Sequence, residues 1–285
     1  MTLGDSVEPI TSRRNPIVTR FRNASGQRAT SNLTIVLEGP TLIAEALGAG
    51  VHLELVAVST SLVQNGPAAE LIGQLKFATQ LVPVSPIVMD AISPVPSPSG
   101  LVALATTRPV HIDDMLATSH PFVVGLDGVQ DPGNTGAVIR TVEAGGASGV
   151  VTIGGADPYS WKALRGSMGS IFRIPVTRFI NRQPIVREVT KRGCKIIATA
   201  PSGGTCMTET DLKEPCLLLL GSEGQGLNED VINAAHEVIS IPMREPVESL
   251  NLAVTAALII YEAAKQRCAS TIETASLVRH LKHLS

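Results

Sequence analysis

The sequence predicts an α/β protein with two domains and a mostly parallel sheet in the second domain. Three observations lead to this prediction: the length of 285 residues, an alternation of short apolar runs with helical patterns, and an entirely apolar run at Cys216–Leu220. A chain of this length exceeds the usual size of a single core. Strands that alternate with helices indicate α/β layers, and a strand without polar alternation is typical of a sheet centre that is covered on both faces.

The first 107 residues are expected to form a smaller N-terminal α/β domain. Its expected strands are 34–37, 53–58, 81–84 and 101–105, and its expected helices are 40–47 and 68–78. Proline, serine and glycine dominate residues 93–100, which predicts a turn-rich loop. Residues 108–120 are the expected linker to the second domain.

The second domain is expected to cover residues 121–267 and to be followed by a C-terminal tail, 268–285. Its six expected strands are 122–126, 149–153, 174–177, 195–199, 216–220 and 238–242. The pattern then predicts a last helix over 250–265 that is apolar nearly all round. A helix without a polar face must be buried. This one therefore requires either a covering partner subunit or an unusual path through its own fold.

Positive charge is concentrated in two stretches, although the net charge is only -2. Residues 1–30 form a basic arm with five arginines against two acids, and residues 162–195 carry nine basic residues against the single acid Glu188. The arm contains Arg13, Arg14, Arg20, Arg22 and Arg28. Such stretches are usually solvated faces, but they are also the footprint of proteins that bind the phosphate backbone of nucleic acids. Phe77 is the only aromatic residue in the body of the N-terminal domain, which argues against base stacking there.

Composition also indicates a cytoplasmic protein without a membrane partner or a metal. No apolar run approaches the roughly 18 residues that span a bilayer, and the N-terminal residues do not resemble a signal peptide. Four cysteines are spread along the chain without a C-x-x-C pair or nearby histidines, so a metal site and a disulfide framework are both disfavoured. We expect reduced, mostly buried thiols.

A turn at Asp131–Arg140 is a candidate ligand site. It follows an apolar strand, Phe122–Leu126, and precedes a helix that the pattern carries through Ala144 with Asn134 as its predicted N-cap. In open α/β sheets, ligands bind at the carboxyl ends of the strands. Arg140 lies one helical turn after Gly136, so its side chain would lean over a position that leaves room for a ligand. Taken alone, the turn is equally well explained as an ordinary connection.

Two further strand ends carry polar or glycine-rich turns. Gly221–Leu227 contains three glycines, which let backbone amides approach a ligand closely. Met243–Asn251 precedes the last helix, where Ser249 or Asn251 could simply act as a cap. Neither turn is a P-loop, and the chain has no G-x-G-x-x-G turn at the first strand of either domain. A common dinucleotide site is therefore disfavoured.

Together the three turns resemble the signature motifs of a known family. N-x-G-x-x-x-R, G-S-E-G-Q-G-L and I-P-M-x-x-x-V-E-S-L-N, in this order, are similar to the motifs of the SpoU (TrmH-like) RNA ribose methyltransferases of the SPOUT superfamily. The resemblance covers residues 121–265. Upstream, the segments 10–18, 36–40 and 98–102 resemble the N-terminal extension by which ribosomal-RNA members bind their substrate. The resemblance implies a trefoil-knotted α/β domain that binds S-adenosylmethionine (AdoMet), and a homodimer with active sites at the subunit interface.

The resemblance also assigns candidate residues to three roles. The matching catalytic residues are Asn134, Arg140, Glu223, Ser249 and Asn251. The cofactor-binding residues would be Thr199, Ala200, Gly203, Gly221, Glu223, Gly226, Leu227, Ile241, Met243 and Leu250. The RNA-binding residues would be Arg13, Arg14, Arg20, Arg22, Arg165 and Ser167.

Chemistry narrows the expected role of Arg140. Methyl transfer to a hydroxyl needs alignment, stabilisation of the charge that develops on oxygen, and an acceptor for the proton. A guanidinium is effectively never deprotonated in proteins, so we assign Arg140 to orienting the nucleotide and stabilising charge. We expect Glu223 to pair with Arg140, Asn134 and Asn251 to hold the substrate or Arg140, and Ser249 to form local hydrogen bonds as a cap.

The predicted function is therefore methylation of a ribose 2'-hydroxyl, with ribosomal RNA of the 23S type as the expected substrate because of the N-terminal extension. A methyltransferase of transfer RNA and a catalytically inactive RNA-binding relative remain alternatives. A nucleotide-binding metabolic enzyme of the doubly wound class is a third, but the sequence has no phosphate fingerprint for it. Binding of AdoMet would distinguish an active enzyme from an inactive relative, and methyl transfer to RNA would exclude the metabolic enzyme.

Overall fold

The computed structural model describes residues 8–24, 33–62, 66–108 and 110–282. The chain divides into two compact units. The first unit consists of residues 1–109 together with 159–172, and the second consists of 110–158 together with 173–285. The segment 159–172, which the sequence placed inside the second domain, is thus grouped with the first unit.

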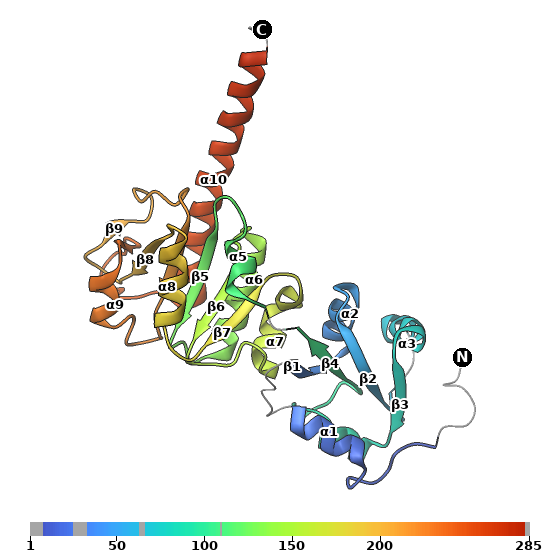
Figure 1. Cartoon of the computed structure of the whole chain (residues 1–285). Coiled ribbons are helices and arrows are strands. Elements are labelled where there is room, and N and C mark those ends of the chain that lie inside the picture. Colours follow the sequence, from blue (N-terminus) through green and yellow to red (C-terminus); the bar gives the residue numbers. More distant parts are fainter. Residues whose placement is uncertain (1–7, 25–32, 63–65, 109, 283–285) are drawn as a thin grey trace. The chain divides into compact units, whose positions relative to one another are not determined.

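The first unit has a four-stranded mixed sheet in the order β1-β4-β2-β3 (Figure 1). β1 and β2 pair with β4 antiparallel, whereas β2 and β3 are parallel. Its strands are β1 (Leu33–Glu38), β2 (His52–Ser59), β3 (Gln80–Val84) and β4 (Leu101–Thr107), and its helices are α1 (Pro16–Ala24), α2 (Pro40–Gly48), α3 (Gly66–Ala78), α4 (Pro86–Ile92) and α7 (Trp161–Ser167) with the short helix η1 (Ser170–Phe172). All four predicted strands are present.

The predicted basic arm is partly a packed helix. α1 buries Val18 and Phe21 completely in the core of the first unit, beside residues of β1, β2, β3, β4 and α4. The two apolar residues are three positions apart and therefore share one helical face. Only the charged face of α1 remains available to a partner, while Arg28 lies outside the described residues.

The second unit contains a seven-stranded, all-parallel sheet in the order β7-β6-β5-β10-β8-β11-β9. The strands are β5 (Phe122–Asp127), β6 (Gly149–Ile153), β7 (Val176–Phe179), β8 (Lys195–Thr199), β9 (Thr205–Cys206), β10 (Cys216–Leu220) and β11 (Glu237–Ser240), and the helices are α5 (Ile112–Leu116), α6 (Pro132–Ala144), α8 (Gln183–Lys191), α9 (Glu229–Ala234) and α10 (Leu252–Lys282). β10 is buried throughout and lies between β5 and β8, as its composition predicted. β9 was not predicted, because two residues carry no periodicity.

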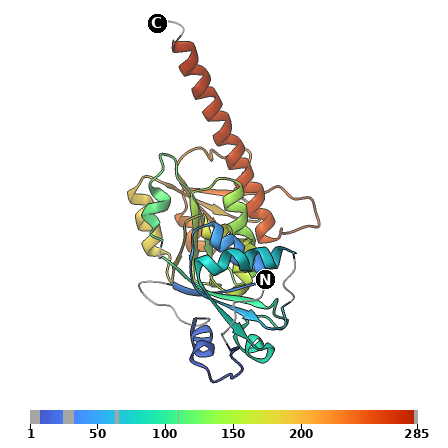
Figure 2. The same cartoon turned by 90° about the vertical axis from the view of Figure 1, so that its right-hand side faces the viewer.

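α10 packs against α6 but is not buried all round. Ala256, Ile260 and Ala263 are completely buried, and Gly145 at the end of α6 allows close packing, since a Cβ there would lie 2.3 Å from Ile260 Cγ2. Val254, Leu258 and Tyr261 are 47%, 39% and 55% exposed. In the single chain one face of the helix is therefore exposed, and its burial by a partner subunit stays a prediction. α10 also continues past the predicted end at residue 265 (Figure 2).

None of the helices among the described residues is both long enough and apolar enough to cross a membrane.

Candidate functional site

The turn between β5 and α6 directs Asn134 toward other side chains. Asp131, not Asn134, is the N-cap of α6, since its Oδ1 accepts a hydrogen bond from Gly133 N at 2.7 Å. Pro132 occupies the first helical position, where a missing N–H costs nothing. The prediction that Asn134 caps the helix is therefore wrong. Because Asp131 satisfies the helix end, the amide of Asn134 is available for tertiary hydrogen bonds.

Asn134 joins the three motif segments in one hydrogen-bonded chain. Its Nδ2 donates to Glu223 Oε1 at 2.8 Å, and its Oδ1 accepts from Asn251 Nδ2 at 3.2 Å. Glu223 Oε2 also accepts from Gln130 N at 3.3 Å. Segments 89 and 117 residues away from Asn134 thus meet at this side chain. Both oxygens of Glu223 have partners, so the expected pairing of Glu223 with Arg140 is not observed.

Asn251 also fixes the start of α10. Its Oδ1 accepts from the backbone N–H groups of Ala253 and Val254 at 2.9 and 3.4 Å. Of the two caps that the sequence offered, Asn251 is therefore the one observed, and the capping role expected of Ser249 is not. Ser249 is exposed and lies in the wall of the cavity described below.

Arg140 lies in the same helix as Asn134, six residues further on. This spacing corresponds to about 9 Å along the helix axis. Its side chain is exposed, and among the described residues it takes part in no hydrogen bond or ion pair. The guanidinium is therefore available to a ligand.

A cavity of about 460 Å³ opens at the carboxyl ends of β8, β10 and β11. These strands are neighbours in the sheet, so their following turns meet at one edge. The cavity wall contains most of the predicted cofactor residues: Thr199, Ala200, Gly221, Glu223, Gly226, Ile241, Met243 and Leu250, together with Ser249 and Asn251. The wall also contains Leu252, Thr255 and Ile259 of α10, which lie outside the predicted cofactor-binding stretches.

Two predicted cofactor residues do not line this cavity. Leu227 is 7% exposed and packs in the hydrophobic core of the second unit. Gly203 is exposed in the loop between β8 and β9. The glycine-rich motif therefore contributes its first six residues to the wall and uses its final leucine as a core anchor.

Gly221 makes the glycine-rich wall possible. A Cβ at this position would lie 2.1 Å from the carbonyl carbon of Gly226, a distance that no side chain tolerates. Ser222 and Gly226 hydrogen-bond each other in both directions, N to O, at 3.2 and 2.9 Å. The loop is consequently a tight hairpin, and its backbone comes close enough to the cavity to form part of the wall.

The same hairpin borders a second, more polar cavity of about 440 Å³. Asp127 and Arg182 line it and form an ion pair at 2.5 Å, with Gln130 and Glu223 nearby in the wall. The hairpin thus separates a largely apolar cavity from a charged one.

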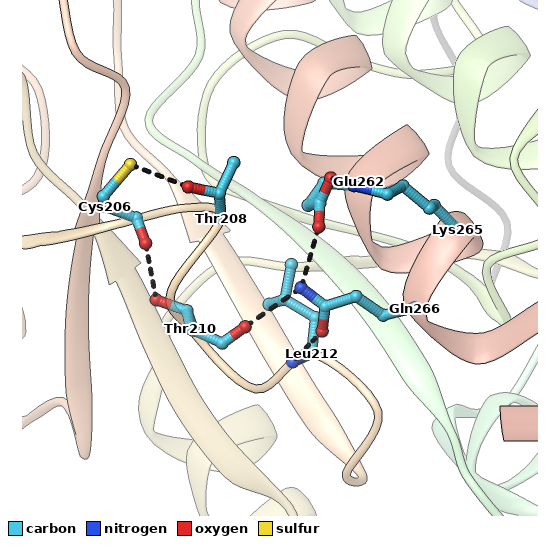
Figure 3. Close-up of polar contacts among 7 residues, drawn as sticks. All are labelled: Cys206, Thr208, Thr210, Leu212, Glu262, Lys265 and Gln266. Carbon is cyan, nitrogen blue, oxygen red and sulfur yellow. Dashed lines mark hydrogen bonds and ion pairs between the residues drawn. The ribbon is translucent and has the colours of Figure 1, made fainter. Parts of the chain in front are cut away.

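α10 is fastened to the loop after β9 by amide hydrogen bonds (Figure 3). Gln266 Nε2 donates to the Thr210 carbonyl oxygen and to Glu262 Oε1, in both cases at 3.1 Å. Gln266 Oε1 accepts from Leu212 N at 2.9 Å. The hydrogen bond from Gln266 and the contact with Lys265, at 3.1 Å, lower the pKa of Glu262. These contacts hold the helix whose first turns line the cavity.

The basic stretch 162–195 is partly neutralised by carboxylates outside it. Four of its arginines form ion pairs: Arg173 with Glu143, Arg178 with Asp157, Arg182 with Asp127 and Arg192 with Asp113. The local count against Glu188 alone overestimated the positive charge, because these partners are distant in sequence. Arg187, Lys191 and Lys195 remain exposed.

The predicted RNA-binding residues differ in their surroundings. Ser167 is completely buried and its hydroxyl donates to the Leu164 carbonyl oxygen at 2.8 Å, which contradicts the expectation that it faces RNA. Arg165 is exposed. In and before α1, Arg13 donates to the Ile87 carbonyl oxygen at 3.3 Å and Arg20 pairs with Glu54 at 2.8 Å, while Arg14 and Arg22 are exposed.

Two of the cysteines, Cys194 and Cys216, are buried. Burial raises the pKa of Cys216 to about 11 and also raises the pKa of Cys194. Within the described part of the chain, no group of three or more His, Cys, Asp or Glu residues lies close enough together to hold a metal ion.

Comparisons with known proteins agree on one family. The model of the SpoU rRNA methylase family matches residues 121–261. An uncharacterised tRNA/rRNA methyltransferase of Synechocystis is 30% identical over 94% of this chain and 98% of its own length. The 23S rRNA (guanosine-2'-O)-methyltransferase RlmP of Bacillus subtilis is 31% identical over 81% of this chain and 89% of its own length. Among solved structures, the SpoU methyltransferase AviRb of Streptomyces viridochromogenes in complex with AdoMet is 26% identical, with a TM-score of 0.80 over 90% of this chain and 99% of that one.

Proposed function

Because the chain belongs to the SpoU rRNA methylase family, we propose that it transfers a methyl group from AdoMet to a ribose 2'-hydroxyl of RNA. The resemblance seen in the three motifs is confirmed, as are the α/β fold class and the class of enzyme. The observation that carries the proposal is the hydrogen-bonded chain Glu223–Asn134–Asn251, which joins the three motifs at the edge of the cavity.

The cavity fits AdoMet in size and in lining. Its volume falls within the range of about 300–1,000 Å³ typical of small-molecule sites. Ile241, Met243 and Leu250 supply apolar walls suited to an aromatic base, and the hairpin 221–226 supplies backbone groups that can approach a ligand closely. When bound, AdoMet supplies an electrophilic methyl group on a sulfonium.

The residues of this chain supply alignment and charge. Arg140 is uncommitted within the described residues, so it can orient the nucleotide and stabilise the charge that develops on the 2'-oxygen. Asn134 is held from both sides by Glu223 and Asn251, and this fixes the geometry of the cavity edge. Glu223 is a poor candidate for the base because both its oxygens already accept hydrogen bonds. We assign the proton to water or to a phosphate oxygen of the RNA.

Ribosomal RNA of the 23S type is the preferred substrate. The Bacillus relative, which is named for a 23S rRNA activity, aligns over most of this chain, including the first unit. We propose that residues 1–107 bind RNA through Arg13, Arg14, Arg20 and Arg22, together with Arg165 of the same unit. Residues 108–120 would link this region to the methyltransferase domain 121–267. We further propose that the enzyme acts in the cytoplasm. Transfer RNA is the alternative substrate, because the Synechocystis relative is named for both RNAs.

We also propose that the enzyme is a homodimer with a trefoil knot in its second unit. The exposed apolar side chains Val254, Leu258 and Tyr261 lie at i, i+4 and i+7 on α10 and so share one face. An apolar stripe of this kind on a helix is typical of a face that a partner covers. A second copy of α10 would cover it.

The test is methyl transfer from tritiated AdoMet to purified 23S, 16S and transfer RNA, with AdoMet affinity measured separately by calorimetry. We expect AdoMet binding and labelling of 23S RNA that resists alkaline hydrolysis at one ribose. Labelling of transfer RNA alone would show that transfer RNA, and not 23S RNA, is the substrate. AdoMet binding without labelling of any RNA would contradict the proposed reaction.

A further inference from the structure

The first unit contains a cavity of about 550 Å³ that shares no residue with the cofactor cavity. Its walls come from three separate segments. The β1–α2 turn contributes Glu38–Leu42, the proline-rich loop contributes Val95–Ser97, and α7 with its C-cap contributes Trp161, Arg165 and Met168. Neither the loop nor Trp161 has a role in the proposed reaction.

α7 presents one continuous face to this cavity. Trp161 and Arg165 are four residues apart in α7 and therefore share one helical face, and Met168, the C-cap residue after the helix, also lines the cavity. Trp161 is half-buried, so part of its ring is accessible, and Lys162 Nζ lies 5.6 Å from its centroid. Met168 is 45% exposed, with a left-handed backbone at φ 49°. This part of the wall therefore offers the ring of Trp161, the thioether of Met168 and the guanidinium of Arg165.

The β1 end of the wall offers a carboxylate, Glu38, that is held by a hydrogen bond. One oxygen of Glu38 accepts from Ser99 N at 2.8 Å, and this bond ties the end of β1 to the proline-rich loop. Each carboxylate oxygen can accept two hydrogen bonds, so Glu38 can accept further hydrogen bonds from a ligand. A carboxylate repels phosphate but accepts from N–H groups on the edge of a base.

We infer that this cavity binds an unpaired nucleotide of the RNA substrate, with the base stacked on Trp161, its N–H edge on Glu38 and its phosphate near Arg165. Proteins that read RNA by sequence stack unpaired bases on aromatic rings and hydrogen-bond their edges. Guanine fits best, because it presents two adjacent N–H donors to one carboxylate. The separate lining residues make this a recognition nucleotide and not the methyl acceptor. The inference rests on the proposed function and adds a base-reading site to it.

Trp161 is the only tryptophan of the chain, so its fluorescence reports directly on stacking. Titrating the full-length protein with GMP, AMP, CMP and UMP should give saturable quenching, strongest with GMP. Glu38→Gln should reduce the preference for GMP over AMP. Quenching that is absent, or equal for all four nucleotides and insensitive to Glu38→Gln, would overturn the inference.

Kinetics with 23S RNA give the second test. Trp161→Ala should raise KM for RNA about tenfold, at the scale of one lost stacking contact, and leave kcat and AdoMet affinity unchanged. Trp161→Phe should recover most of the loss. Phe77→Ala is the matched control, because Phe77 is 95% exposed in the same unit and lies outside the cavity. An unchanged KM in Trp161→Ala would overturn the inference.

The two proposals fail differently. If the wild type binds AdoMet but methylates no RNA while GMP still quenches Trp161, the proposed reaction falls and the nucleotide site stands. If the wild type methylates RNA and Trp161→Ala does so with an unchanged KM, only the nucleotide site falls. Melting temperature and AdoMet affinity of each variant verify folding.

Discussion

The two cavities are formed by different kinds of residue. The cavity proposed to bind AdoMet, called here the cofactor cavity, lies in the second unit where three neighbouring parallel strands end, and its wall is largely apolar side chains and glycine-rich backbone. The cavity of the first unit combines an aromatic ring, a guanidinium and a carboxylate from three distant segments. The first arrangement suits close packing around one fixed ligand, and the second suits reading of a base and its phosphate. Substitutions at the site of the second unit should therefore change turnover or AdoMet binding, whereas substitutions in the cavity of the first unit should change the affinity for RNA.

The largest expected effect is on turnover. Arg140→Ala should lower kcat about 10²- to 10³-fold, the scale for loss of one group that stabilises developing charge. AdoMet affinity should stay unchanged, because Arg140 does not line the cofactor cavity. The measurement is single-turnover methyl transfer at saturating RNA, with Lys76→Ala in α3 as the control for loss of an exposed cation.

Arg140→Lys tests the role assigned to the guanidinium. Restored activity with a shifted basic limb in the pH–rate profile would show that residue 140 acts as a base, and would contradict its assignment to orientation and charge.

The next effect is confined to the cofactor cavity. Gly221→Ala should weaken AdoMet binding about five- to hundredfold, because the added Cβ would meet Gly226 at 2.1 Å and overpacking of this kind costs about 1–3 kcal/mol. Calorimetry measures this. Gly73→Ala in α3 is the matched control, since its Cβ would have no neighbour within 4 Å. Equal AdoMet affinities in the two variants would show that the hairpin does not hold the cofactor.

The two cavities also differ in how far sequence could predict them. Runs such as Cys216–Leu220 and the turns that follow them are contiguous, so the strand ends could be predicted from the pattern, and the family resemblance of these turns pointed to most residues of the cavity wall. The hydrogen-bond partners of Asn134 could not, because they are 89 and 117 residues away. Trp161 was assigned to the other domain, and base stacking in the first unit was therefore disfavoured. Grouping 159–172 with that unit supplies the missing aromatic ring.

A smaller expected effect is on dimerisation through α10, the helix whose first turns line the cofactor cavity. If the exposed face of α10 joins two subunits, Leu258→Asp should weaken dimerisation about tenfold or more, because it places a charge in an apolar interface. Analytical ultracentrifugation over a concentration series measures this. Ile180→Asp is the matched control, being 83% exposed and outside α10. A wild-type chain that is monomeric at all concentrations would remove the dimer proposal.

The smallest effect concerns the attachment of α10, and it depends on pH. The bonds from Gln266 and Lys265 lower the folded-state pKa of Glu262 below its ordinary value, so the ionised carboxylate stabilises the fold. That contribution is fully present above the unfolded pKa, about 4.3, and is lost as pH falls through the lower folded pKa. Glu262→Gln should therefore melt slightly below the wild type at pH 7, with the difference shrinking as the pH falls through the lowered folded-state pKa. Glu70→Gln, which removes an exposed carboxylate of α3, should show no such trend. A gap for Glu262→Gln that stays constant on acidification would mean that the attachment of α10 depends on its amide bonds and not on this charge.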